Sequence, residues 1–167
     1  MPIIAIASPS DWQRVQKLRL AALQDTPDAF GSTFEDESQR PPEWWIGRLQ
    51  SSGSVTFMAV EPCDSGMAVL GPYNAPPDRG VFAVWVAPEH RGRGVGDALM
   101  SAVIAEARSL GVGRLVLDVD RLNLPARRLY LRYDFSPTGI ESTLPPPRSH
   151  IMEDQLELIL EVARLTP

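Results

Sequence analysis

Two spacings of hydrophobic residues recur along the chain, and each spacing predicts one kind of element. Apolar residues at every third or fourth position predict helices, whereas short apolar or alternating runs bounded by Gly, Pro and Ser predict strands. Helices are predicted at residues 12–24, 42–49, 97–110 and 123–133, and strands at 3–7, 55–61, 66–73, 81–86, 114–119 and 155–162. With a further strand before the last one, the expected order is β, α, α, β, β, β, α, β, α, β, β.

This order predicts an α+β fold, with a mixed and mostly antiparallel sheet and helices on both faces. The segments 81–86, 97–110 and 114–119 form a strand–helix–strand unit, so the two strands of this unit should be a parallel pair. Residues 74–80 are expected to form a Pro-rich loop before the unit, and residues 28–40 a loop that leads to the second helix. No repeat or linker divides the chain, so one domain is expected over residues 1–167.

The strand at 81–86 and the residues after it combine the features of an anion site. The strand reads VFAVWV, which suits a buried, central position, and Pro88 ends it because proline has no N–H for the ladder. The turn RGRGVG follows at 91–96, and a helix is expected from Asp97 onwards. Glycines let a backbone approach a ligand closely, and the free N–H groups of a first helical turn attract anions. The arginines in the turn suit a phosphate.

Composition narrows the class of partner. The chain carries a net charge of -5, which argues against nucleic-acid binding, since such proteins present a basic surface. An acidic protein is compatible with an amine substrate. The single cysteine, Cys63, allows no internal disulfide and fits a reducing, cytoplasmic location.

Other classes are disfavoured by what the sequence lacks. His90 and His150 have no Cys or His at ligand spacing, so no metal is expected. The first ten residues have too short an apolar run for a signal peptide, and no stretch is long enough to span a membrane.

Spacing separates three kinds of phosphate-binding loop. A Walker A loop needs Gly-Lys-Ser/Thr, but Asp97 follows Gly96. The dinucleotide fingerprint needs Gly-x-Gly-x-x-Gly directly after its strand, which the spacing of Gly92, Gly94 and Gly96 does not match. The third pattern, Arg/Gln-x-x-Gly-x-Gly/Ala, is matched by Arg91, Gly94 and Gly96. This segment resembles the acetyl-CoA pyrophosphate loop of the GNAT superfamily of N-acetyltransferases.

A second set of residues carries the same resemblance. After the strand that holds Asp118, the family shows Asn-x-x-Ala-x-x-Leu-Tyr and then a Gly-Phe pair. This chain has the first motif at residues 123–130, and Asp134 replaces the glycine before Phe135. The chain is therefore similar to GNAT proteins across residues 81–135. Asp adopts a left-handed conformation less readily than Gly, so the turn at Asp134 is a point of difference.

The resemblance implies how acetyl-CoA would bind. The backbones of Val84, Trp85 and Val86 would hydrogen-bond the pantetheine arm beside a strand that is bulged and splayed in the family. The backbone N–H groups of the following loop would hold the pyrophosphate, and Asn123 would contact the arm near the thioester while also capping its helix. The loop residues are Arg91, Gly92, Arg93, Gly94, Val95, Gly96 and Asp97.

The resemblance also implies two catalytic residues. Tyr130 lies two helical turns after Asn123 and would be the general acid that protonates the CoA thiolate; a core aromatic is the alternative. Asp118 would be the base that takes a proton from the amine through water, with a solvent-facing carboxylate as the alternative. Phe30, Phe34 and Glu35 are candidates for the acceptor site.

The expected function is direct transfer of an acetyl group from acetyl-CoA to a primary amine, in a small molecule or at a protein N-terminus. An acyl-CoA-binding module or sensor without turnover is an alternative from another class, and an NAD-dependent oxidoreductase is a third. A homodimer through the C-terminal strand is a further expectation.

Overall fold

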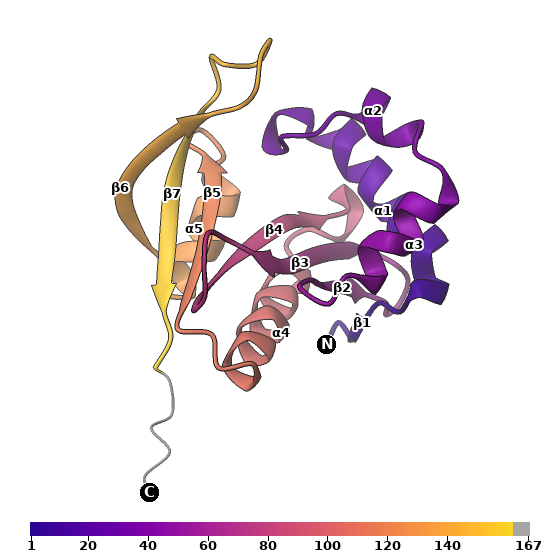
Figure 1. The fold of residues 1–167 in the computed structure, drawn as a ribbon, viewed down its shortest axis with the longest axis horizontal. Helices are drawn as coiled ribbons and strands as arrows, with labels where there is room; N and C mark the ends of the chain where they lie inside the picture. The colour runs from indigo at the N-terminus through magenta and orange to yellow at the C-terminus, as the bar shows by residue number, and fades with distance from the viewer. Residues whose placement is uncertain (162–167) are drawn as a thin grey trace, which may run out of the picture.

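The computed structural model describes residues 1–161, whose strands form one seven-stranded sheet in the order β1-β2-β3-β4-β5-β7-β6 (Figure 1). All neighbouring strands are antiparallel except β4 and β5, which form the expected parallel pair. The strands are β1 (Ile4–Ile6), β2 (Val55–Ala59), β3 (Gly66–Pro72), β4 (Asp78–Val86), β5 (Arg114–Asp120), β6 (Ser136–Thr143) and β7 (Met152–Ile159).

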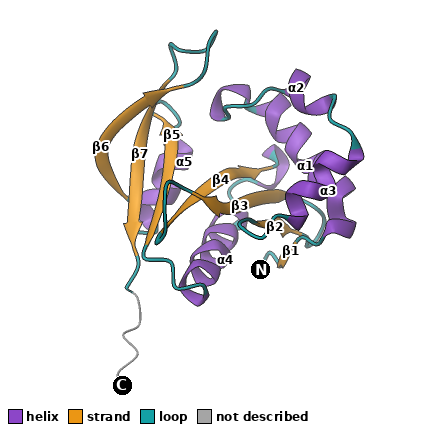
Figure 2. Ribbon diagram, viewed as in Figure 1, coloured by secondary structure: helices purple, strands orange, loops and turns teal. Residues whose placement is uncertain are grey.

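Helices cover both faces of the sheet, as expected (Figure 2). Helix α4 packs with α5 against one face, and α1 packs against the other with the short helices before β2. The α-helices are α1 (Trp12–Asp25), α2 (Phe34–Ser38), α3 (Pro42–Gln50), α4 (Val95–Ser109) and α5 (Leu124–Arg132). In the described residues no helix combines the length and the apolarity needed to cross a membrane.

The period of two along the strands divides the core into two layers. In β2, Phe57 belongs to the cluster under α4, and its neighbour Met58 belongs to the cluster under α1. Both side chains are buried to 98% or more, because each face of the sheet is covered by a helix. Leu99 and Val103 fill the α4 layer without any exposed surface. The apolar stripe that predicts α4 is thus the face that packs on the sheet.

The parallel pair opens into a V. Strands β4 and β5 pair only over Asp78–Gly80 and Arg114–Val116, and β4 then continues to Val86 with no partner on that side (Figure 1). On its other side β4 carries a bulge, because Met67 and Val69 of β3 oppose Trp85 and Phe82. The extra residue places Ala83 at a positive φ of 53°. The splayed strand edge expected from the resemblance is present.

Four local expectations are wrong. Helix α4 begins at Val95 rather than Asp97, because Gly94 is its N-cap. Strand β4 begins at Asp78, inside the expected loop, because pairing with both β3 and β5 extends it. The expected loop at 28–40 contains α2, whose cap is the Thr33 hydroxyl. The strand at 81–86 is central but not fully buried: Phe82 is 42% exposed, because β5 diverges from this edge.

Two expectations concern the end of the chain. The final strand, predicted at 155–162, is β7 at Met152–Ile159, and Val162 lies outside the described residues. The single domain over 1–167 stays a prediction, although the described strands all belong to one sheet.

At the turn after α5, Asp134 adopts the left-handed conformation with φ 65°, so this residue retains the geometry that glycine would favour.

Candidate active site

Two cavities meet inside the V between β4 and β5. The first, of about 550 Å³, lies beside the glycine loop and α4, and we call it the loop cavity. The second, of about 500 Å³, lies between β4, β5 and the segment before α2, and we call it the acceptor-side cavity. They share five lining residues, which mark the junction: Ala29, Val84, Asn123, Ala126 and Tyr130.

The glycine loop exposes backbone donors to the loop cavity. Gly92 and Gly94 have φ of 70° and 81°, conformations that side chains disfavour, and they turn the chain sharply into α4. The first intrahelical hydrogen bond runs from Ala98 N to Gly94 O at 3.0 Å, so the N–H groups of Val95, Gly96 and Asp97 precede the helical ladder. Free N–H groups and the positive end of the helix dipole make this loop suitable for a phosphate.

The charged side chains of the loop are held by the protein. The Arg91 Nε donates to Val86 O at 3.0 Å, and its terminal nitrogen pairs with the Asp25 carboxylate, which also accepts from Trp85 Nε1 at 2.9 Å. Asp97 forms an ion pair with Arg132 at 3.0 Å. Except for Arg93, the seven predicted loop residues line the loop cavity, and Arg93 lines a separate cavity near Met1.

The unpaired edge of β4 presents backbone groups to the same cavity. Ala87 N donates to Ser65 O at 2.8 Å, and Gly66 lies opposite Val86. In an antiparallel ladder this pattern makes Val86 a non-hydrogen-bonded position, so its N–H and C=O point away from β3. By the same alternation the backbone of Trp85 points toward β3. The residues that line the loop cavity from this strand are Val84, Trp85 and Val86.

Asn123 and Tyr130 come from either end of α5 and both lie at the junction. The Asn123 side chain accepts from Ala126 N at 3.2 Å, which confirms its expected role as helix cap. Tyr130 is only 7% exposed and packs with Phe135 at a ring distance of 6.0 Å, so it is also a core aromatic. Burial raises the pKa of the Tyr130 phenol, which keeps it protonated at neutral pH.

The far wall of the acceptor-side cavity contains a buried ion pair. The Arg19 guanidinium donates to both oxygens of Glu37 at 3.0 and 2.9 Å and lies 4.8 Å over the Phe30 ring. Although burial opposes it, this contact lowers the pKa of Glu37. Of the three predicted acceptor-site residues, Phe30 lines the cavity, whereas Phe34 and Glu35 lie outside both linings.

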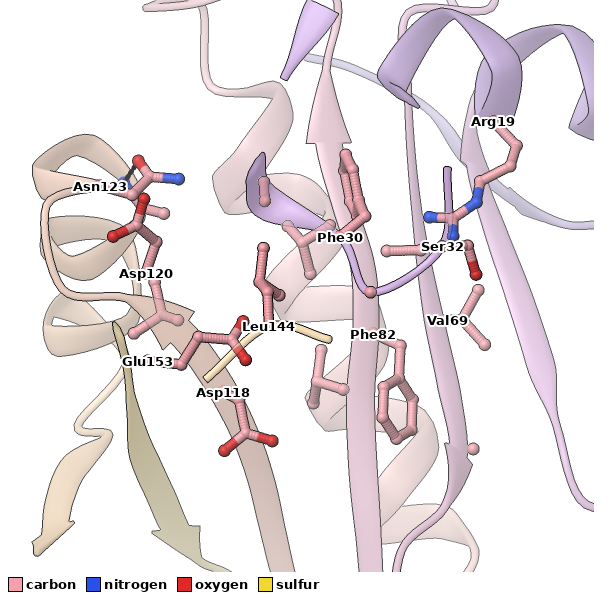
Figure 3. Close-up of a pocket in the computed structure, with 18 of the residues that line it drawn as sticks. Arg19, Phe30, Ser32, Val69, Phe82, Asp118, Asp120, Asn123, Leu144 and Glu153 are labelled. Atoms are coloured by element: carbon pink, nitrogen blue, oxygen red, sulfur yellow. Dashed lines mark hydrogen bonds between the residues drawn. The ribbon is translucent and has the colours of Figure 1, made fainter. Parts of the chain in front are cut away.

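The near wall is acidic. Asp118 and Asp120 of β5 and Glu153 of β7 line the cavity, and Asp120 lies opposite Glu153 in the strand register. Figure 3 shows these carboxylates on the side of Asn123, with Arg19 beyond Phe30 on the opposite side. Partial desolvation raises the pKa of Asp118, and desolvation with repulsion by Asp118 and Asp120 raises the pKa of Glu153.

Arg148 joins two loops beside this cavity. Its guanidinium donates to the backbone oxygens of Pro27, Phe30 and Gly31 at 2.6, 2.8 and 2.9 Å. These bonds tie the β6–β7 connection, which contributes Leu144 to the lining, to the segment before α2.

The sequence reasoning missed Arg19, Asp120, Glu153 and Arg148 as residues of this site. Asp120 carried a local signal, because it lies two residues after Asp118 and thus on the same face of β5. The other three are brought in by packing between distant segments.

The sequence is similar to those of known acetyltransferases. Residues 18–135 match the Acetyltransferase (GNAT) family. Streptothricin acetyltransferase of Streptomyces lavendulae is 35% identical over 121 residues, which cover 71% of this chain and 59% of that protein. Mycothiol acetyltransferase of Thermobispora bispora is 32% identical over 125 residues, 71% of this chain and 41% of that protein. The chain thus spans about half the length of these relatives.

Solved structures show the same fold at low identity. The yncA protein of Salmonella typhimurium, solved with its cofactor acetyl-CoA, has a TM-score of 0.79 at 23% identity and covers 100% of this chain and 98% of its own. A GNAT acetyltransferase from Streptococcus pneumoniae has a TM-score of 0.81 at 19% identity and covers 96% of this chain and 100% of its own. The match over most of the chain, together with the splayed strands and the glycine loop, establishes that this protein belongs to the acetyltransferase (GNAT) family.

Proposed function

We propose that this protein transfers an acetyl group from acetyl-CoA directly to a primary amine. The observation that carries the proposal is the meeting of two cavities at Tyr130: one has the donors for a pyrophosphate, and the other has carboxylates for an amine. Such an arrangement brings two substrates together in one complex, and the gain in proximity and orientation supplies much of the rate enhancement.

Acetyl-CoA fits the loop cavity by its chemistry. The N–H groups of residues 92–97 suit the pyrophosphate, and the open edge of β4 suits the amide groups of the pantetheine arm, as an added strand would. The Val86 N–H points away from β3 and is the candidate to polarise the thioester carbonyl. Arg128 also lines this cavity and offers a cation for a CoA phosphate.

In the proposed reaction Asp118 takes a proton from the acceptor ammonium through water, which frees the nitrogen lone pair. The amine nitrogen then attacks the thioester carbon; the C–N bond forms, the C–S bond breaks, and Tyr130 gives its proton to the departing thiolate. The nitrogen loses its remaining excess proton to water, and the Tyr130 phenolate takes a proton back from water, which leaves the amide, free CoA thiol and the phenol. The raised pKa of Asp118 makes it a better base than an ordinary aspartate. Burial raises the pKa of the Tyr130 phenol and makes it a weaker acid, so its position at the junction supports the acid role rather than its pKa. No enzyme-bound acetyl group is invoked, because Cys63 lies outside both cavity linings.

The acceptor is a small-molecule amine or a protein N-terminus. The names of the relatives support the first choice, since they are acetyltransferases named for streptothricin and mycothiol. A plant structure of the same fold, NAA60 of Arabidopsis thaliana, was solved with a bisubstrate analogue. The non-catalytic module remains the alternative function, and homodimer formation remains a prediction.

Calorimetric titration with acetyl-CoA, with CoA and NAD as controls, tests the first half of the proposal. We expect micromolar binding of acetyl-CoA and none of NAD. Incubation with acetyl-CoA and a panel of primary amines, followed by mass spectrometry, tests the second half. Binding without acetylation of any amine would favour the module, and no binding of either CoA species would refute both functions.

A further inference from the structure

The acceptor-side cavity holds more carboxylates than the proposed transfer uses. Asp118 has a role as the base, but Asp120 and Glu153 line the same wall without one. They lie opposite each other on β5 and β7, so their side chains share one face of the sheet. Three carboxylates on one wall repel one another unless a cation lies between them.

The cations near this wall are engaged elsewhere. Arg148 directs its donors to the three backbone oxygens before α2, and Arg19 gives a bidentate contact to Glu37. In residues 1–161 neither Asp118 nor Glu153 has a hydrogen-bond or ion-pair partner. Among the described residues, the Asp120 carboxylate accepts only the Leu122 N–H, at 2.9 Å. Desolvation raises the pKa of Asp118, and desolvation with repulsion by Asp118 and Asp120 raises the pKa of Glu153 against the attraction of Arg148.

A second observation points to a polar ligand at the same place. Tyr130 is only 7% exposed, and it lines the cavity. Within the described residues its hydroxyl has no hydrogen-bond partner. The hydroxyl is not among the fully buried polar atoms of the described residues, and Tyr130 lines both cavities, so a polar molecule bound at the junction can pair with it.

We propose that the acceptor carries a second cationic group, an ammonium or a guanidinium, besides the amine that reacts, and that Glu153 with Asp120 binds it. The inference rests on the proposed transfer function of the same cavity. A zwitterionic acceptor fits this wall less well, because its carboxylate would face the acidic residues or would have to reach Arg19 and Arg48 on the far side, which both contact Glu37. A monoamine would leave Glu153 without a partner.

Three probes of equal chain length test the proposal: 1,5-diaminopentane, 1-aminopentane and 5-aminopentanoic acid. Each is titrated calorimetrically into the protein saturated with CoA, and each is assayed with acetyl-CoA for release of the free thiol. We expect the diamine to bind at least about tenfold more tightly than the monoamine, the size of effect that one charge-assisted hydrogen bond provides. The amino acid should bind most weakly.

The variants Glu153→Gln and Asp120→Asn should bring the diamine-to-monoamine affinity ratio close to one. Both keep the side-chain shape. Glu153 has no partner within residues 1–161, and asparagine at position 120 keeps an oxygen that can accept the Leu122 N–H, so neither change should impair folding. Glu43→Gln is the matched control, since it removes one exposed charge from α3, outside both cavity linings, and should leave the ratio unchanged.

The outcomes separate this inference from the proposed function. Equal affinity for the diamine and the monoamine, or an unchanged ratio in Glu153→Gln, overturns the inference even where acetyl transfer proceeds. Preferential and Glu153-dependent binding of the diamine with no acetylation of any amine supports the cation site and overturns the transfer.

Discussion

The two cavities that meet at Tyr130 are built in different ways. The loop cavity draws most of its donors from backbone: a glycine turn, the first turn of α4 and the open edge of β4. The acceptor-side cavity draws its chemistry from side chains on several separate segments, such as Arg19, Asp118 and Glu153. Backbone donors suit a ligand that is common to a whole family, whereas side chains from many segments vary freely. The difference explains why the family indicates the acetyl donor but leaves the acceptor open.

The largest expected effect is on kcat and comes from a substitution at the junction of the two cavities. Tyr130→Phe removes the proposed acid, and kcat should fall about a hundredfold, within the range for general acid catalysis. The affinity for acetyl-CoA should not change, and neither should stability, because the hydroxyl makes no hydrogen bond within residues 1–161. Steady-state kinetics and calorimetry measure both quantities.

The control for this substitution is Tyr133→Phe. The Tyr133 hydroxyl donates to Asp97 O at 2.8 Å and lies on the same helical segment, so its removal should cost stability, about 1 kcal/mol, rather than kcat. A wild-type kcat in Tyr130→Phe would show that the tyrosine is only a core aromatic.

The second prediction concerns the loop cavity alone. Gly94→Val places a β-branched side chain at φ 81° and fills open space, since no atom lies within 4 Å of a Cβ there. Holding valine in this left-handed backbone conformation costs about 1–2 kcal/mol of folding free energy. Acetyl-CoA should bind more than about tenfold more weakly, as calorimetry would measure, because the side chain blocks the approach of a phosphate. Gly47→Ala, also in open space but in α3, should bind normally; equal loss in both variants would contradict the role of the loop.

The third prediction concerns the acceptor-side cavity alone. Arg148→Gln removes three hydrogen bonds to the segment 27–31 and loosens one wall. The KM for an amine acceptor should rise about threefold to tenfold, while the KM for acetyl-CoA stays the same. Initial-rate kinetics with each substrate varied in turn separates the two constants. Arg108→Gln, an exposed position on α4, should change neither, and a parallel rise of both constants in Arg148→Gln would mean that the cavities are not independent.

The smallest expected effect is on stability and depends on pH. In the folded protein the pKa of Glu153 is raised, so the folded state binds the proton more tightly than the unfolded state does. Stability therefore falls as the pH rises through the two pKa values. At pH 7 Glu153→Gln should melt on the order of 1 °C higher than the wild type, and below about pH 4 the advantage should disappear.

Thermal melts of both proteins across this pH range test the sign of the difference in melting temperature. A lower melting temperature of Glu153→Gln at pH 7 would indicate that the carboxylate has a stabilising partner in the folded protein. Such a result would also weaken the inferred cation site.

The fold and the loop cavity were predictable because their signals are local. The apolar run before Pro88, the glycines at 92, 94 and 96, and the spacing from Asn123 to Tyr130 all lie within one strand–helix–strand–helix unit. Two of the details that failed lie at element ends. Helix α4 begins at Val95, before the predicted start, because the left-handed Gly94 serves as its N-cap. Strand β4 begins before its predicted start because a strand on each side pairs with its first residues.

The acceptor-side cavity was only partly predictable. Asp118 and Phe30 line it, whereas Phe34 and Glu35, chosen because acidic and aromatic residues suit an amine, lie outside it. Glu37, two residues later, is neutralised by Arg19 instead of facing a substrate. Nothing local distinguishes Glu153 or Arg148 from the other charged residues near the C-terminal strand.

By itself, the sequence of this protein determined the class of fold, the phosphate-binding loop and the two residues proposed for proton transfer. Hydrophobic periodicity and glycine spacing act within a few residues, so they are visible in one dimension. Only the tertiary structure decided which side of β4 stays unpaired, which carboxylates share a wall and where the two cavities meet. Those features depend on the divergence of β4 from β5 and on the β5–β7 register, which brings Asp120 opposite Glu153 across 33 positions of sequence.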